Sequence, residues 1–310
     1  MDGLTLRQLR YFDALARHRQ FGHAAEACAI SQPALSVQIA RLEDILGHKL
    51  FERDSRQVRL TALGADMVER VRDILRAVDG LKELAAMAED GRSTRLRLGV
   101  IPTIAPYLLP ALLARLRASD AGVDIHVRET LTSRLVQELD EGRIDAAIVA
   151  LPVGQAGLIE THLFDEPLLL VRHAEVEANP VPRAEHLVNM RLLLLEDGHC
   201  FRDRALSFCN IAASGRRGEL DGSSLSTLVQ MVGAGVGATL IPQMAVPIEV
   251  RSAPVCAVRF AAPEPVRAIG LIRRNATVLT AQLEELVEAV RAVGVECAEQ
   301  ADAILRQRSV

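Results

Sequence analysis

Three short amphipathic segments at the start of the chain restrict the fold more than any other feature of the sequence. Hydrophobic residues recur at helical spacing over Leu4–His18 and again over Phe21–Cys28. Ser31 is a typical N-cap residue, and Pro33 is tolerated in the first turn of a third helix that we expect to end near Gly47. The pattern predicts three helices, each with one buried face.

A basic, alternating segment follows the third helix. The alternation around Val58 and Leu60 predicts a short β-hairpin. The formal net charge of −4 by itself argues against a polyanionic partner, but Lys and Arg outnumber Asp and Glu by nine to seven over residues 1–64. Three helices and a basic hairpin indicate a winged helix-turn-helix that binds DNA, and the alternative is a three-helix interaction domain.

The third helix has small or polar residues opposite its hydrophobic stripe. Such a surface can lie deep in the major groove, where Gln32 and Ser36 could bond base edges. In the hairpin, Arg53, Arg56 and Arg59 could contact phosphates.

Residues 62–90 contain no proline and predict one long helix. Its hydrophobic residues recur alternately four and three positions apart, at Met67, Val71, Ile74, Val78, Leu81 and Ala85. This spacing is typical of a coiled-coil seam, and a winged domain that reads a palindrome needs a partner at fixed spacing. We therefore expect a dimer, the alternative being a helix that packs on its own domain. The segment Gly91–Thr94 ends the helix and marks a domain boundary.

The rest of the chain alternates predicted strands with predicted helices, which indicates an α/β architecture. The expected strands are Leu96–Ile101, Val123–Arg128, Ile144–Ala150, Leu168–Val171, Leu192–Leu195, Ala238–Ile241, Val255–Phe260 and Ala268–Ile272. The expected helices include Leu108–Arg117, Ser133–Glu141, Ser224–Gly233 and Val278–Val293. The glycines of Gly233–Gly237 follow a helix and precede a strand, the reverse of a dinucleotide-binding loop, so we interpret them as a helix end and a turn.

Composition and cysteine spacing bear on the location of the protein and on whether it binds a metal or a cofactor. No apolar run approaches the length of about 18 residues that a membrane span needs, and the N-terminus does not resemble a signal peptide. We therefore expect a cytoplasmic protein with no membrane partner. The five cysteines include no Cys-x-x-Cys pair, so we expect thiols, no metal site and no cofactor. Cys28 and Cys256 fit core positions, whereas Cys297 has no clear placement.

One cysteine lies in a segment that favours redox chemistry. Cys200 follows a hydrophobic strand and an Asp-Gly turn, at the predicted start of a helix, between His199 and Arg202. The helix dipole and the positive neighbour stabilise a thiolate there, and a thiolate attacks peroxide to give a sulfenic acid. Cys209 is the candidate resolving thiol.

The spacing of these two cysteines has a structural consequence. Nine helical residues put the two side chains on opposite faces and about 13 Å apart along the axis. A disulfide needs Cα atoms within about 7 Å. Oxidation would therefore unwind the helix, which is the behaviour of a switch. The alternative is two unrelated buried cysteines.

Taken together, the N-terminal motifs resemble the LysR-type transcriptional regulators. The segments that carry the resemblance are Leu6–Phe12, Ala24–Ala25, Ser31–Ser36, Leu42–Glu43, Leu46–Gly47, Leu50–Arg53 and Leu60–Gly64. The resemblance implies a DNA surface formed by Ser31, Gln32, Pro33, Ser36, Gln38, Arg53 and Arg56.

The same resemblance implies a domain organisation. Residues 1–62 would form the all-α winged helix-turn-helix domain, residues 63–91 the linker and dimerisation helix, and residues 95–310 an α/β regulatory domain. That domain would comprise two Rossmann-like subdomains hinged like a periplasmic binding protein. Roughly, they are 95–165 with 268–310, and 166–267.

The segment Leu194–Cys209 resembles the redox segment of the peroxide-sensing activators of this family, as do Ile101–Pro110 and Ser224–Val232. This implies that Cys200 is peroxidatic and Cys209 resolving. It further implies that Thr103, Thr132, His199 and Asp203 hold the peroxide, with Arg202 assisting the thiolate. One departure is that Ser214–Glu219 lacks the histidine that some relatives have after the second cysteine.

The implied partners are promoter DNA, RNA polymerase, hydrogen peroxide as the signal, and a glutaredoxin or thioredoxin reductant, in a homodimer or homotetramer. Two alternatives remain at this point. One is a LysR-type regulator that binds a small organic effector between the subdomains. The other is a thiol peroxidase with a DNA-binding appendage, which would turn over repeatedly instead of consuming about one peroxide per cycle.

Overall fold

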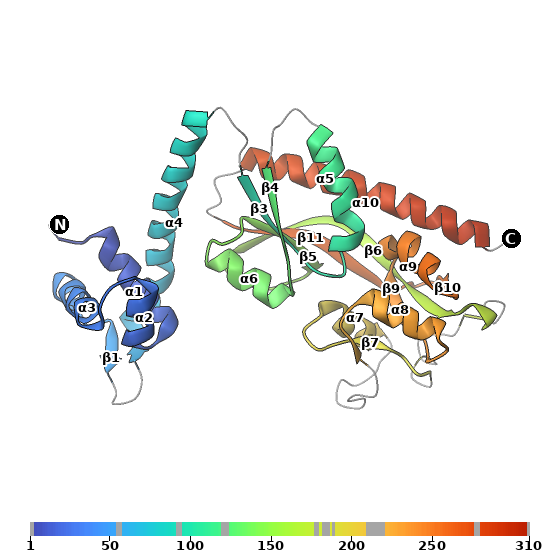
Figure 1. Ribbon diagram of the computed structural model, residues 1–310, viewed down its shortest axis with the longest axis horizontal. Coiled ribbons are helices and arrows are strands. Elements are labelled where there is room, and N and C mark those ends of the chain that lie inside the picture. Colours follow the sequence, from blue (N-terminus) through green and yellow to red (C-terminus); the bar gives the residue numbers. More distant parts are fainter. Residues whose placement is uncertain are drawn as a thin grey trace. The chain divides into compact units, whose positions relative to one another are not determined.

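The computed structural model in Figure 1 describes residues 3–53, 58–90, 95–118, 124–176, 180–181, 187, 190–208, 221–275 and 280–308. The chain divides into two units, Met1–Gly91 and Arg92–Val310, which are described separately. Within the described residues, no helix has both the length and the apolar character that crossing a membrane would require.

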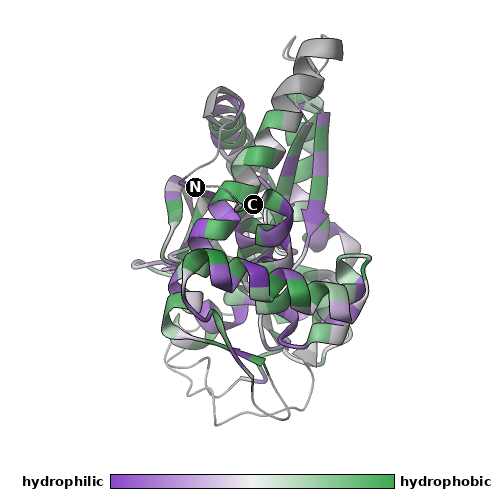
Figure 2. Cartoon of the chain, turned by 90° about the vertical axis from the view of Figure 1, so that its left-hand side faces the viewer, coloured by the Kyte–Doolittle hydropathy of each residue, from purple (hydrophilic) through white to green (hydrophobic). Residues whose placement is uncertain are grey.

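The N-terminal unit has the predicted winged helix-turn-helix arrangement. Its elements are α1 (Leu6–His18), α2 (Phe21–Ala27), α3 (Gln32–Leu46), the antiparallel strands β1 (Phe51–Arg53) and β2 (Val58–Leu60), and α4 (Ala62–Asp90). Local signals begin the helices: Thr5 forms a capping box with Gln8, and the Ser31 hydroxyl accepts from the Ala34 amide. Figure 2 shows hydrophobic and hydrophilic residues alternating around these helices, as expected for helices with one buried face.

The predicted seam of α4 is divided between two environments. Val71 is 2% exposed in the core of its own unit, and Met67 packs against the same core. Val78 is half-buried, whereas Ile74 and Leu81 are exposed. The structure thus corrects the expected place of Val71, which lies in the core of its own unit, where its apolar side chain is removed from water, and not on an exposed seam. Ile74 and Leu81 remain free for the predicted dimer contact.

A buried carboxylate joins α3 to the hairpin. Glu43 is 4% exposed and accepts the amides of Leu50 and Phe51 at 2.9 and 3.2 Å, and the Lys49 ammonium at 2.8 Å. Burial acts to raise the pKa of Glu43, but the bonds from Lys49 and the two amides outweigh it and lower the pKa.

The second unit is built on a mixed sheet. Among the described residues, seven strands form one sheet in the order β10-β6-β11-β5-β3-β4, with β9 also on β6. These strands are β3 (Arg95–Val100), β4 (Asp124–Glu129), β5 (Ala146–Leu151), β6 (Leu158–His173), β9 (Thr239–Pro242), β10 (Val255–Val258) and β11 (Val266–Arg274). The remaining elements are α5 (Ala105–Ala118), α6 (Thr132–Asp140), η1 (Ala174–Val176), β7 (Leu194–Leu195), α7 (Cys200–Phe208), β8 (Asp221–Gly222), α8 (Leu225–Gly233), η3 (Gln243–Ala245), α9 (Val246–Ser252) and α10 (Thr280–Arg308). The predicted α/β fold class is confirmed.

The long strand β6 connects two lobes. We use "first lobe" for β3–β5 with α5 and α6, and "second lobe" for β7–β10 with α7–α9. Residues 158–167 of β6 pair with β11, and residues 168–173 pair with β9 and β10. The change of partner comes at Pro167, where the Leu168 amide donates to the Pro265 carbonyl at 2.8 Å. The sequence predicted only 168–171 as a strand, because polar residues interrupt the earlier part.

The helix α10 lies along both lobes, as Figure 1 shows. Its Glu296 pairs with Arg115 of α5 at 3.0 Å, and its Asp302 accepts from Gln243 of η3 at 2.7 Å. One rigid helix is therefore bonded to the first lobe and to the segment that follows β9.

We predict that Glu43→Gln lowers the free energy of unfolding of the N-terminal unit by about 2 kcal/mol at pH 7, because amides lose a charged acceptor. A lowered folded pKa stabilises above the unfolded value of about 4.3, and this stabilisation is lost as the pH falls through the folded pKa. The difference from wild type should therefore shrink below about pH 4. Amide hydrogen exchange on the full chain measures the free energy of unfolding of the N-terminal unit. Glu52→Gln, at an exposed position, is the control, and equal effects of the two variants would contradict the prediction.

Candidate functional site

Cys200 is the first residue of α7, directly after β7 and a turn at Asp197–Gly198. Gly198 has φ +96°, a left-handed conformation that glycine adopts without strain. The Cys200 side chain is half-buried, and its Sγ lies 3.8 Å from Oγ1 of Thr132, the first residue of α6 in the first lobe. The structure therefore brings together a thiol at a helix N-terminus and one of the predicted hydroxyl groups.

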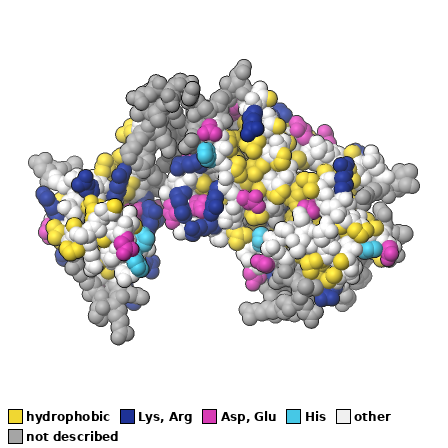
Figure 3. All heavy atoms as spheres, in the orientation of Figure 1, with side chains coloured by type: hydrophobic (Ala, Val, Ile, Leu, Met, Phe, Trp, Pro, Cys, Tyr) yellow, Lys and Arg dark blue, Asp and Glu magenta, His cyan; other side chains and the backbone are white. Residues whose placement is uncertain are grey.

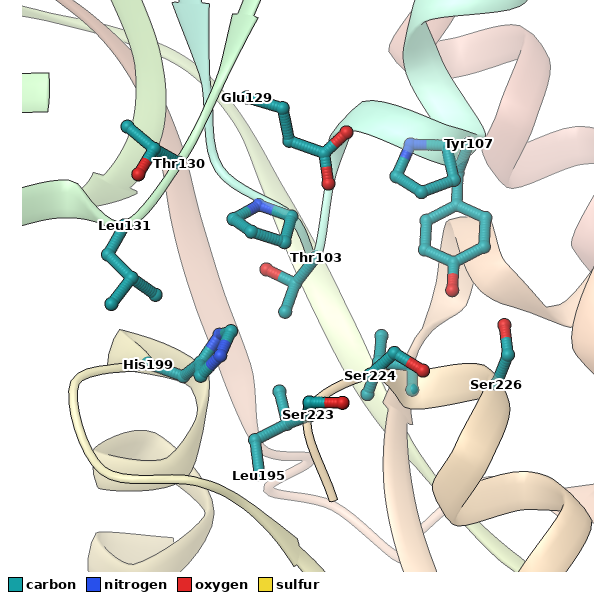
Figure 4. Close-up of a pocket in the computed structure, with 13 residues that line it drawn as sticks. Thr103, Tyr107, Glu129, Thr130, Leu131, Leu195, His199, Ser223, Ser224 and Ser226 are labelled. Atoms are coloured by element: carbon teal, nitrogen blue, oxygen red, sulfur yellow. The ribbon is translucent and has the colours of Figure 1, made fainter.

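A cavity of about 370 Å³ lies between the two lobes, next to this turn. Its lining comprises Pro102, Thr103, Pro106, Tyr107, Glu129, Thr130, Leu131, Leu195, His199, Ser223, Ser224, Leu225 and Ser226. Figure 4 shows Thr103, Glu129 and His199 directed into it. Burial lowers the pKa of His199, against an opposing effect of the Glu196 carboxylate, so the imidazole is neutral near pH 7. A neutral imidazole can accept a proton from a reacting group.

Thr103 is oriented by an arginine that the sequence did not single out. The Arg267 guanidinium is fully buried and donates from Nη1 to Thr103 Oγ1 at 2.8 Å and from Nη2 to the Thr103 carbonyl at 3.1 Å. Because the Thr103 oxygen accepts from a cation, its own proton remains available for donation to another group.

The charge of Arg267 is balanced inside the protein. Its Nη2 lies 2.7 Å from Oε2 of Glu166, and the other carboxylate oxygen, Oε1, accepts the Met244 amide at 2.9 Å. The Arg267 guanidinium carbon lies 5.3 Å from the ring centre of Phe201 in α7. In the sequence, Arg267 and Glu166 lie just outside predicted strands, where charged residues are typically exposed. They are 101 positions apart, so no local pattern indicated that they pair.

Arg202 and Asp203 occupy different environments. Arg202 is 7% exposed, donates from Nη1 to the Leu195 carbonyl at 2.7 Å, and has its Nε 3.1 Å from Asp197. These bonds hold the turn that precedes Cys200. Asp203 is exposed on α7. Their roles toward the thiolate and the peroxide stay predictions.

The other described cysteines have surroundings that suit packing. Cys256 and Cys297 are buried, and Cys28 packs against the core of the N-terminal unit. Burial raises the pKa of Cys28 and of Cys297, with nearby carboxylates acting in the same direction, so both remain protonated thiols. Cys209 lies outside the described residues. Within the described part of the chain, no cluster of His, Cys, Asp and Glu could hold a metal ion.

The predicted DNA surface is available on α3. Ser31, Gln32 and Pro33 are exposed, and Ser36 and Gln38 are half-buried. Arg56 and the side chain of Arg53 lie outside the description. Figure 3 shows Lys and Arg side chains on the visible face of the N-terminal unit, among hydrophobic and acidic ones. This surface offers polar groups on the face of α3 opposite its buried residues Leu35, Ile39 and Leu42.

Two protein families match this chain. The family described as "Bacterial regulatory helix-turn-helix protein, lysR family" matches residues 6–65, and "LysR substrate binding domain" matches residues 89–294. The chain is 42% identical over 292 residues to the DNA-binding transcriptional dual regulator OxyR of Escherichia coli K12, covering 93% of this chain and 95% of that protein. It is 37% identical over 290 residues to the hydrogen peroxide-inducible genes activator of Haemophilus influenzae, covering 93% and 96%.

Solved structures of similar proteins agree with these matches. A hydrogen-peroxide-bound cysteine-to-serine variant of Corynebacterium glutamicum OxyR is 32% identical, with a TM-score of 0.66 over 97% of this chain and 95% of that one. A full-length cysteine-to-aspartate variant of Pseudomonas aeruginosa OxyR is 34% identical, with a TM-score of 0.69 over 94% and 96%.

We predict that Arg267→Met destabilises the second unit by about 3 kcal/mol, because it leaves the Glu166 carboxylate buried without its cation. The double variant Arg267→Met/Glu166→Gln should recover part of this loss, since the amide removes the charge and retains an acceptor for the Met244 amide. Urea unfolding of the full chain measures both. A double variant no more stable than Arg267→Met would contradict the prediction.

Proposed function

The chain belongs to the LysR family of transcriptional regulators, and we propose from this membership that Cys200 is its sensing residue for hydrogen peroxide. Within the family it belongs with the OxyR proteins, the hydrogen peroxide-inducible genes activators. It is a DNA-binding regulator of that type, with peroxide as its signal.

The observation that carries the proposal is the setting of the Cys200 thiol. It lies at the first turn of α7, with its Sγ facing the Thr132 hydroxyl. The helix N-terminus favours the thiolate, and a hydroxyl donor can hold the peroxide oxygen. Attack of the thiolate sulfur on one peroxide oxygen breaks the O–O bond. The products are a Cys200 sulfenic acid and a hydroxide that is protonated to water.

The second step is the reaction of the Cys209 thiol with the sulfenic acid. The new S–S bond forms as the sulfenic oxygen leaves as water. Since α7 extends from Cys200 to Phe208, it places Phe208 about 12 Å along its axis from Cys200, and the Cα of the next residue can lie only about 3.8 Å from that of Phe208. A disulfide needs Cα atoms within about 7 Å, so its formation must unwind part of α7, the helix that carries the Arg202 bond to the Leu195 carbonyl.

This rearrangement would reach the promoter through the assembly. We propose that the chain acts as a homodimer or homotetramer in the cytoplasm, contacts DNA through α3 and the hairpin, and changes its recruitment of RNA polymerase on oxidation. A glutaredoxin or thioredoxin system would restore the two thiols. Among the described side chains of α4, Leu63, Ile74 and Leu81 are exposed apolar residues, and the last two lie on the predicted seam available to a second copy.

A second candidate function is supported by the cavity of about 370 Å³, which is large enough for a small organic effector. A catalytic thiol peroxidase is disfavoured, since the relatives are transcription regulators. We propose that the chain is not an enzyme and consumes about one peroxide per oxidation cycle.

We predict that one equivalent of hydrogen peroxide converts the wild-type chain to the Cys200–Cys209 disulfide and changes its footprint on a target promoter. Cys200→Ser should do neither, because it lacks the attacking sulfur. Thr132→Val should form the same disulfide about tenfold more slowly, having lost one donor to the developing charge. Mass spectrometry with thiol labelling measures the disulfide and its rate. If the wild type forms no such bond, or if the footprint is the same before and after oxidation, the proposal is wrong.

We also predict that Gln32→Ala weakens binding to the cognate site about tenfold, since a side chain that reads a base edge contributes roughly 1–3 kcal/mol of discrimination. Affinity for unrelated DNA and the salt dependence should stay the same, because the phosphate contacts are unchanged. Titrations at several salt concentrations measure this. A parallel loss on both DNAs would assign Gln32 a nonspecific role.

A further inference from the structure

Two groups of contacts join the lobes directly at opposite ends of the cavity. At the end beside the redox residues, the Cys200 Sγ lies 3.8 Å from the Thr132 Oγ1, and Arg204 Nη2 donates to the Leu151 carbonyl at 2.8 Å. At the other end, the Tyr107 hydroxyl of α5 donates to Oε1 of Glu249 on α9 at 2.8 Å.

The second contact is a buried cluster that we name the latch: Tyr107, Ser226 and Glu249. Glu249 is 2% exposed, and its Oε1 also accepts from the Ser226 hydroxyl of α8 at 2.7 Å. Burial, together with the Glu249 carboxylate, raises the pKa of Tyr107, so the phenol remains a protonated donor. Figure 4 shows the Tyr107 and Ser226 hydroxyls at the same end of the cavity, away from His199.

Oxidation affects the two ends of the cavity differently. The second lobe's contacts at the redox end come from α7, the helix that must unwind for a Cys200–Cys209 disulfide. The latch residues lie on α5, α8 and α9, outside the redox segment. A Cys200–Cys209 disulfide would therefore disturb the contacts at one end, whereas the other end contains no residue that takes part in the reaction.

We propose that the latch holds the two lobes together in the disulfide form, when the contacts of α7 with the first lobe are lost. This rests on the proposed function, since it requires the disulfide. The lobes share the strands β6 and β11 and the helix α10, and the crossing strands form a hinge about which the lobes can rotate. In the reduced protein the contacts at both ends of the cavity hold the lobes together in addition to α10, and in the oxidised protein the latch and α10 remain. Loss of the latch should therefore increase hydrogen exchange much more in the oxidised protein than in the reduced protein.

The test uses Tyr107→Phe, which removes the hydroxyl and keeps the ring. Amide hydrogen exchange is followed in α5, α8 and α9 of the full chain, both reduced and peroxide-oxidised. In the reduced form we expect exchange within about twofold of wild type. In the oxidised form we expect it to be faster by about tenfold, the effect of losing one buried hydrogen bond. Ser226→Ala, which removes a bond that positions Glu249, should show the same redox dependence with a smaller increase.

The matched control is Gln230→Ala. Gln230 of α8 donates to the Ser252 carbonyl at the end of α9 at 2.8 Å, so it joins the same two helices without reaching the first lobe. It should show no difference between the redox states. If Tyr107→Phe accelerates hydrogen exchange equally in both redox states, the latch has a purely structural role. If it accelerates exchange in neither state, the latch does not hold the lobes together and the proposal is wrong. Disulfide mapping on the same samples separates these outcomes from failure of the proposed function, since a wild type without the disulfide overturns both.

Discussion

The buried ion pair between Arg267 and Glu166 is the interaction on which the second unit depends. The two residues are direct partners in the pairing of β11 with β6, beside the position at which β6 changes to β9 and β10. Removing two charges from water is costly, and their attraction compensates only where the remaining donors and acceptors are also used. Here Met244 donates to the carboxylate and Thr103 accepts from the guanidinium, so the crossing strands and the cavity wall share one polar network.

Unlike the buried ion pair and its network, the redox segment is suited to local refolding. The helix α7 has nine residues, fewer than an isolated helix needs to be stable in water, so its contacts hold it in place. Some of these are hydrogen bonds from the Arg202 and Arg204 side chains to backbone carbonyls. A covalent S–S bond can replace such contacts while the ion pair at the crossing strands stays in place. A local refolding step inside a rigid frame is the physical requirement for a reversible switch.

The helices of the N-terminal unit were predictable almost in full, because their signals are local. Ser31 and Pro33 begin α3, and the hydrophobic spacing determines which face is buried. Strands of the second unit were predicted where they are hydrophobic throughout, as in β5, or where hydrophobic residues alternate with polar ones, as in β3. The first part of β6 was missed, since its polar residues depend on partners distant in sequence. Val71 was placed in the dimer seam for a related reason: periodicity shows that a face is apolar without showing what covers it.

The sequence by itself determined the local helices and strands and the position of Cys200 at a helix start. It also determined that a helix beginning at Cys200 is incompatible with a disulfide to a thiol nine residues later. Each follows from the geometry of a short segment of chain. Only the tertiary structure decided which distant groups surround the thiol. Thr132 comes to Cys200 from the first lobe, Arg267 orients Thr103, and Glu249 receives Tyr107 across the cavity. Such pairings join residues as many as 164 positions apart. They depend on how the strands cross and how the lobes pack, and no local spacing in the sequence specifies that arrangement.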